Sequence, residues 1–99
     1  MEEDVKVELI NKDNTKHVYS CNRIRRNDNK RLRVRIYAKD VKSAWVDLKW
    51  VGDVKFLMFY IKSEKHVDEI VFNVETTRMK TLKRFVNDFR KNGIEIEGL

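Results

Sequence analysis

The side chains that could ligate a metal or act as nucleophiles are few: His17, Cys21 and His66. His17 and Cys21 are four residues apart, so on a strand they share one face. Zinc sites use three or four such ligands at recognisable spacing, and the sequence has no second His/Cys pair to complete one. We therefore expect neither a metal site nor a cofactor, and we expect the single cysteine to be a free thiol, as is common in a reducing compartment.

Catalytic motifs are also missing from the sequence. It has no glycine-rich phosphate loop and no Gly-x-Ser-x-Gly nucleophile elbow. Carboxylates such as Asp47 and Asp53 are scattered, whereas a small hydrolase or nuclease would need them in a cluster. We interpret Glu64, His66 and Asp68 as residues of a solvated polar loop. The protein is therefore predicted not to be an enzyme.

The positively charged residues, by contrast, are concentrated in two segments. The chain has 22 lysines and arginines against 16 aspartates and glutamates, which gives a net charge of +6. Residues 23–35 contain seven basic residues and one acidic residue, and residues 77–92 contain six and one. Arginine dominates the first segment, and its planar fork suits phosphate and carboxylate oxygens. This distribution predicts an anionic partner, either nucleic acid or an acidic protein surface.

The first basic segment alternates in a way that gives a more specific prediction. Arg31, Arg33 and Arg35 fall on one face of an expected strand, and Tyr37 continues that face. We interpret this row as a platform that contacts nucleic-acid phosphates and offers an aromatic ring for stacking. Two other interpretations stay open: a solvated strand face that deters edge pairing, and a docking face for an acidic protein. The predicted nucleic-acid-binding residues are Arg23, Arg25, Arg26, Arg31, Arg33, Arg35, Tyr37, Lys83 and Arg84.

Alternating apolar and polar residues, or runs of β-formers, predict the strands that position these side chains. Six segments qualify: residues 5–9, 17–26, 31–39, 44–51, 54–61 and 67–75. Asn27-Asp28-Asn29 predicts a hairpin between the second and third segments, and Gly52-Asp53 predicts one between the fourth and fifth. Residues 54–61 are apolar on both faces, which indicates a central strand covered on one side by the core of the sheet and on the other by a further element, for which the helix is the obvious candidate.

After residue 75 the apolar spacing becomes helical. It predicts a helix over residues 77–92 that begins with Thr76 or Thr77 as N-cap and ends at Gly93. The apolar stripe of this helix consists of Met79, Leu82, Phe85, Val86 and Phe89. Residues 94–96 add a short strand or pack as a tail. The predicted fold is α+β, a curved antiparallel β-sheet or partly open barrel of about six strands capped by one C-terminal amphipathic helix.

Two tryptophans lie on one of the expected strands. Trp45 and Trp50 are five residues apart, so they point to opposite faces. We expect one of them to belong to the core and the other to be covered by the helix or exposed; burial in the core is the favoured interpretation. An exposed Trp45 beside Tyr37 would instead anchor a partner, because tryptophan, tyrosine and arginine dominate binding hot spots.

The last third of the chain resembles part of a known kind of domain. The residues that carry the resemblance are Ile70-Val71-Phe72-Asn73-Val74-Glu75, then Leu82, Phe85, Val86 and Phe89, and finally Asn92-Gly93-Ile94. They look like the last strand and closing helix of small bacterial pleckstrin-homology-like domains. The resemblance implies a bent sheet of seven strands with a C-terminal helix, and a role in protein–protein contact or inhibition. The first hairpin loop offers only Lys12 and Lys16 beside Asp13, which argues against phosphoinositide binding.

Length and composition limit the number of domains and indicate where the protein is located. Its 99 residues fit one domain spanning residues 1–99. The acidic N-terminus is the wrong charge for a signal peptide, and the longest apolar run, residues 56–61, is far shorter than the roughly 20 residues that span a bilayer. We expect a cytoplasmic protein without a membrane span. The oligomeric state stays open, because three apolar residues are expected either under the helix or against a second subunit: Val51, Leu57 and Phe59.

Overall fold

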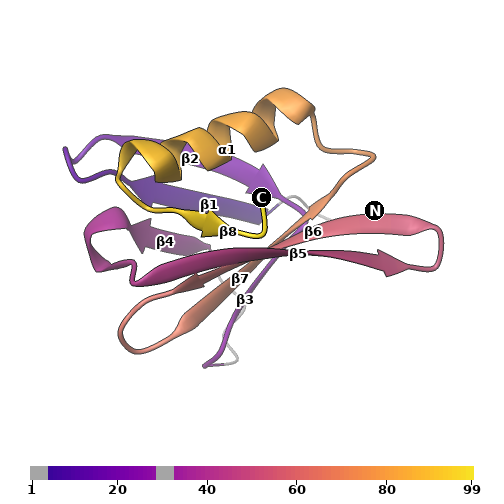
Figure 1. Cartoon of the computed structure of the whole chain (residues 1–99), viewed down its shortest axis with the longest axis horizontal. Coiled ribbons are helices and arrows are strands. Elements are labelled where there is room, and N and C mark those ends of the chain that lie inside the picture. The colour runs from indigo at the N-terminus through magenta and orange to yellow at the C-terminus, as the bar shows by residue number, and fades with distance from the viewer. Residues whose placement is uncertain (1–4, 29–32) are drawn as a thin grey trace.

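The computed structural model describes residues 5–28 and 33–99. In this part of the chain, eight strands, one short 3-10 helix and one α-helix follow one another (Figure 1). The strands are β1 (Val5–Ile10), β2 (Lys16–Cys21), β3 (Arg23–Arg26), β4 (Val34–Tyr37), β5 (Ser43–Val51), β6 (Val54–Lys62), β7 (Val67–Asn73) and β8 (Ile96–Glu97). The helices are η1 (Ala38–Asp40) and α1 (Met79–Lys91). The α+β class predicted from the sequence is confirmed.

The strands form two sheets, so the expected single antiparallel sheet is wrong. One sheet has the order β2-β1-β4 and the other has the order β3-β7-β6-β5-β8. Each sheet contains one parallel ladder, β1 with β4 and β5 with β8, while the other ladders are antiparallel. No closed barrel is present among the described strands. Parallel pairing joins strands that are distant in sequence, which hairpin-sized spacing along the chain cannot reveal.

The segment predicted as one strand over residues 17–26 is divided at Asn22. The residues before Asn22 pair with β1, and those after it pair with β7 in the other sheet. Two hydrogen bonds fix Asn22 against β7 at this break. The Asn22 N–H donates to the Val71 carbonyl at 2.8 Å, and the Asn73 N–H donates to Asn22 Oδ1 at 2.5 Å. The hairpin predicted at Asn27-Asp28-Asn29 is therefore wrong, since the strands on either side of it belong to different sheets; Asn29 itself lies outside the described residues.

The predictions around Gly52 are confirmed. β5 and β6 form an antiparallel hairpin in which Val51 pairs with Val54, and Gly52 has a φ of +60° that glycine adopts without strain. β6 lies between β7 and β5, as expected of a central strand. Phe59 is buried and Leu57 packs against the core, whereas Val51 is exposed at the hairpin tip.

The hydrophobic core lies between the two sheets and α1, which packs over their inner faces (Figure 1). Phe85 of α1 is fully buried at its centre and makes edge-type ring contacts with Tyr19, Phe59, Phe72 and Phe89. Rings from three strands and the helix therefore meet at one side chain. Neither tryptophan belongs to this core, so the expected core placement is wrong: Trp45 is half-buried on the outer face of its sheet, while Trp50, on the opposite face as expected, is 61% exposed.

The helix is close to its predicted length, but it begins differently. Arg78 occupies the N-cap position without a side-chain hydrogen bond to the helix, so neither Thr76 nor Thr77 is the cap. At the other end the prediction is confirmed: Gly93 has a φ of +77°, its N–H donates to the Arg90 carbonyl, and the Ile94 N–H donates to the Phe89 carbonyl. This pair of bonds is the Schellman arrangement that ends helices at glycine. No helix in the described ranges is long and apolar enough to cross a membrane.

Candidate functional site

The residues predicted to bind nucleic acid are distributed over four places. Arg23 and Arg25 are exposed on the outer face of the five-stranded sheet, and Arg26 is half-buried at the end of β3. Arg33, Arg35 and Tyr37 lie on the outer face of the three-stranded sheet. Lys83 and Arg84 lie next to each other on α1 and line one hollow together, while Arg84 also lines a cleft against β2. Arg31 lies outside the described residues. The two basic segments therefore do not form one simple row.

Arg26 already has acidic partners within the chain. Its Nε atom lies 3.3 Å from Oδ1 of Asp68, which is 1% exposed, and 4.0 Å from a carboxylate oxygen of Asp28. Burial raises the pKa of the Asp68 carboxyl, while His66 and Arg26 act in the opposite direction. His66, interpreted from the sequence as a solvated loop residue, in fact lies 3.2 Å from Asp68. Arg26 thus compensates a buried carboxylate.

A glutamate that sequence reasoning overlooked partly neutralises the predicted platform of Arg33 and Arg35. Glu8 of β1 pairs in register with Arg35 of the neighbouring strand and is only 6% exposed. Arg35 Nε donates a hydrogen bond to Glu8 Oε2 at 3.0 Å, and the amino group of Lys16 and a guanidinium nitrogen of Arg33 lie 3.8 and 3.9 Å from Oε1. The hydrogen bond from Arg35 is the main cause that lowers the pKa of Glu8. Three cations around one carboxylate leave this face positive, but less so than the sequence implied.

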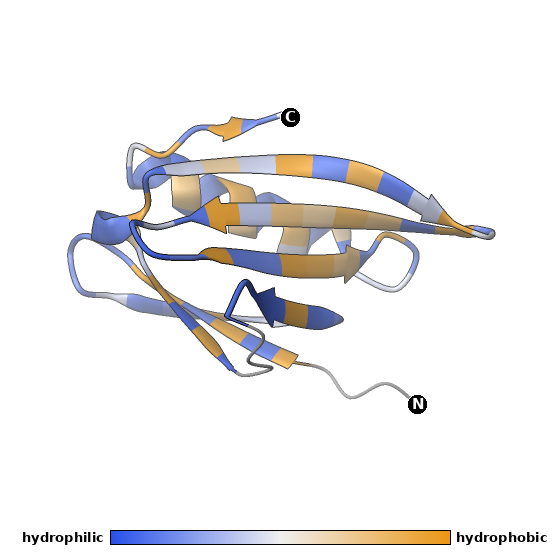
Figure 2. Cartoon of the chain, turned by 90° about the horizontal axis from the view of Figure 1, so that it is seen from below, coloured by the Kyte–Doolittle hydropathy of each residue, from blue (hydrophilic) through white to orange (hydrophobic). Residues whose placement is uncertain are grey.

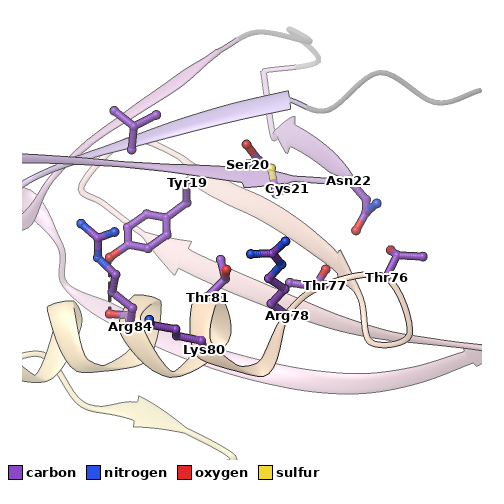
Figure 3. A pocket seen from close by; sticks show the side chains of 11 residues that line it. Tyr19, Ser20, Cys21, Asn22, Thr76, Thr77, Arg78, Lys80, Thr81 and Arg84 are labelled. Carbon is purple, nitrogen blue, oxygen red and sulfur yellow. Dashed lines mark hydrogen bonds between the residues drawn. The ribbon is translucent and has the colours of Figure 1, made fainter.

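The second basic segment, residues 77–92, forms a cleft with β2. The cleft has a volume of about 560 Å³ and lies between β2 and the N-terminal half of α1 (Figure 3). Arg78, Lys80 and Arg84 line its helical side. Hydroxyl and amide groups also line it, supplied by Ser20, Asn22, Thr76, Thr77 and Thr81, and the rest of the lining comes from Val18, Tyr19 and Cys21. The cleft therefore presents cations and hydrogen-bond donors, and no carboxylate of the described residues lines it.

The cations of the cleft are not committed elsewhere. In the ranges 5–28 and 33–99, neither Arg78 nor Lys80 forms an ion pair. Arg84 lies over the Tyr19 ring, with its guanidinium carbon 5.6 Å from the ring centroid. The first turn of α1 contains no acidic residue, so the positive end of the helix dipole adds to these charges. The combination favours the binding of an anion with several oxygen atoms.

A buried polar cluster fixes the helix against β2 and so sets the width of the cleft. The Tyr19 hydroxyl donates a hydrogen bond to the Asp88 carboxylate, and the Nδ1 atom of His17 lies 2.7 Å from the same oxygen. Asp88 and Tyr19 are 4% and 2% exposed. Burial and the Asp88 carboxylate raise the pKa of Tyr19, so its hydroxyl stays protonated and keeps donating. Arg84, one turn before Asp88, is held beside β2 by the same contacts.

Sequence reasoning identified the basic residues of the helix but did not select Arg78 and Lys80 as site residues. It also assigned Thr76 and Thr77 to helix capping, whereas both line the cleft. The sequence did contain a signal for this site. Cations in the first turn of a helix interact unfavourably with the helix dipole, so helix stability does not explain why Arg78 and Lys80 are there. The part that could not be found was β2, which lies more than fifty residues earlier in the chain.

Among the described residues, no group of three or more histidine, cysteine, aspartate or glutamate side chains is placed to hold a metal ion. Compared with protein-family models, curated proteins and solved structures, the chain has no match.

Proposed function

We propose that this protein is a non-enzymatic binding module for an anionic partner, nucleic acid first, and that the cleft between β2 and α1 binds the phosphates. The observation that supports this function is the set of cations in the cleft, Arg78, Lys80 and Arg84, which face hydroxyl groups instead of carboxylates. Lysine and arginine side chains with neighbouring hydroxyl donors are the usual partners of phosphate oxygens in nucleic-acid complexes.

The predicted platform on the three-stranded sheet extends this surface. Ser20 lines the cleft and accepts a hydrogen bond from the Lys6 amino group at 2.6 Å. Lys6 lies on β1, between β2 and the strand that carries Arg35. Because β2 is the edge strand of this sheet, basic side chains lie on both sides of it, from the sheet and from the helix. A phosphate backbone that follows β2 would contact both groups.

The salt dependence of binding tests the proposed function. Three phosphate contacts predict that affinity falls by about 20- to 40-fold between about 50 and 200 mM salt, because each contact releases condensed counterions. Fluorescence anisotropy of labelled DNA and RNA with the nuclease-treated protein measures this slope. Absence of binding at low salt, or an affinity independent of salt, would contradict the proposal.

A second candidate function is the protein-interaction or inhibitor role that the pleckstrin-homology-like resemblance implies. It is favoured by an apolar groove of about 530 Å³ on the opposite side of α1 from the cleft's lining. Leu48, Met79 and Leu99 line it and are 53%, 60% and 59% exposed. Cations also line the groove, namely Lys55, Lys83 and Arg90. This arrangement matches an acidic amphipathic helix, which would place apolar residues in the groove and carboxylates beside its cations.

A synthetic helical peptide with leucines on one face and glutamates on the other tests this second function. We expect saturable binding by isothermal calorimetry, and a loss of about tenfold or more in Leu48→Asp, because the new carboxylate occupies the apolar floor and repels the peptide. Tyr37→Asp, an equal charge change on the other sheet, should bind as the wild type does. Equal binding by both variants, or none by the wild type, would count against the groove.

A further inference from the structure

The outer face of the five-stranded sheet carries side chains that the cleft does not explain. Ile24, Ile70 and Phe72 point into the core, as do Phe59 and Val46, so the residues between them point outward. Strand register places these outward residues in rows. One row is Arg25, Glu69, Tyr60, Trp45 and Glu97, the next is Arg23, Val71, Met58 and Asp47, and a third contains Asn73, Phe56 and Lys49.

No described segment covers this face. Seen from below, strands β5, β6 and β7 lie in front, and the helix lies behind them (Figure 2). The apolar residues of β6 that the sequence assigned to a covered strand are therefore covered on one side only. Phe56, Met58 and Tyr60 are half-buried by their neighbours and remain accessible on this face.

Three aromatic rings lie on this accessible face. Trp45 and Tyr60 are stacked, with ring centroids 5.4 Å apart and planes inclined by 17°. Phe56 lies on the same strand face as Tyr60, four residues away, which corresponds to about 13 Å along a strand. Phe56, Met58 and Val71 line a hollow of about 210 Å³, which lies beside Phe56 and is not lined by Tyr60 or Trp45. Aromatic rings at two places on one face, with a hollow beside one of them, suit the stacking of successive flat groups.

The cations of this face outnumber its carboxylates by one. Four exposed cations belong to it, Arg23, Arg25, Lys49 and Lys62, against the carboxylates of Asp47, Glu69 and Glu97. Arg23 and Lys49 line the hollow beside the aromatic side chain of Phe56. In the described part of the chain, none of the four cations forms an ion pair. The rings are thus bordered by cations that form no ion pair with the described residues.

This face is continuous with the cleft through one residue. Asn22, at the break between β2 and β3, lines both the cleft and the hollow. Its position is fixed by hydrogen bonds to the backbone of β7. A chain that leaves the cleft beside Thr76 can therefore pass Asn22 and reach Arg23 and Phe56 on the sheet.

We propose that the outer face of the five-stranded sheet binds the bases of a single-stranded nucleic acid whose phosphates occupy the cleft. This inference rests on the proposed function and names its ligand class. Aromatic rings stack on bases only when the bases are unpaired and can turn outward, because the bases of a duplex are enclosed between its two backbones. A surface with phosphate contacts alone would not distinguish single-stranded nucleic acid from a duplex.

The test compares a single-stranded oligothymidylate of about 15 nucleotides, a length that spans one such binding face, with a duplex of the same length at low salt. Phe56→Ala removes one stacking ring, and we expect it to weaken single-strand binding by about 5- to 150-fold and to leave duplex binding unchanged. Trp50→Ala is the matched aromatic control, because Trp50 is exposed on the opposite side of the sheet. It should bind both ligands as the wild type does.

A second, spectroscopic test keeps Phe56, so it does not depend on whether Phe56→Ala folds. In a Trp50→Phe variant, Trp45 is the sole tryptophan, so stacked bases should quench its emission with the same dissociation constant as the anisotropy change. Equal affinity for single strand and duplex, with unchanged Trp45 emission, would overturn this inference and leave the proposed function standing. Absence of binding to either ligand would overturn both.

Discussion

The double variant R78E/K80E is expected to bind nucleic acid on the order of 30 times more weakly than the wild type, because each reversal replaces an attraction of about 0.5 kcal/mol with a repulsion of similar size, a loss of about 2 kcal/mol for the two residues. The slope of log affinity against log salt should also fall by about 1.5, since two phosphate contacts disappear. Both residues are exposed and line the cleft. Anisotropy titrations at several salt concentrations measure both effects.

Folding is not expected to suffer in this variant. Arg78 is the N-cap residue of α1 and Lys80 belongs to its first turn, where negative side chains interact favourably with the helix dipole. The free energy of unfolding should therefore be unchanged or slightly higher. A loss of binding together with retained stability separates the role of the cleft in binding from a role in folding.

The matched control is K42E/K65E, which makes the same change of net charge at two exposed lysines away from the cleft. Its affinity should fall much less, because neither lysine lines the cleft that holds the phosphates. If both double variants bind equally weakly, the net charge of the protein governs binding and the cleft has no special part in it.

The largest effect on stability is expected for Phe85→Ala. Phe85 is fully buried, and ring centroids of Tyr19, Phe59, Phe72 and Phe89 lie 5.0–5.3 Å from its own. Removing a buried phenyl ring lowers the free energy of unfolding by about 3–5 kcal/mol, through lost burial and the cavity left behind. Domains of this size are stable by only about 5–15 kcal/mol, so the variant should be partly unfolded at moderate urea concentrations.

Urea denaturation followed by circular dichroism measures this loss, with Met79→Ala as the control on the same helix. Met79 is 60% exposed, so its truncation should change the free energy of unfolding by no more than about 0.5 kcal/mol. A small effect of Phe85→Ala would mean that the helix does not pack on the strands as described. Because α1 supplies one side of the cleft, that result would also remove the proposed site.

Local patterns determined the elements of this fold well. The helical spacing after residue 75 and the glycine at position 93 predicted α1 to within two residues at its start and one at its end. Gly52-Asp53 predicted the β5–β6 hairpin, whose strands are adjacent in the chain. In these cases the residues that decide the structure are neighbours in sequence, so periodicity and turn chemistry contain the necessary information.

The partners of individual side chains required the tertiary structure. Glu8 meets Arg35 only because β1 and β4 pair in parallel, and Asp68 meets Arg26 only because β3 leaves the first sheet for the second. The sequence showed where the positive charges lie, but it could not show which of them are neutralised within the chain.

The same distinction applies to the candidate site. The sequence by itself determined the α+β class, the segments that form β1, β4, β5, β6 and β7, the helix and two basic segments. The tertiary structure decided that β2 faces α1 across a cationic cleft and that Trp45, Tyr60 and Phe56 share an uncovered face. The physical reason is that strand pairing and helix docking join residues far apart in the chain, and their register depends on packing across the whole core.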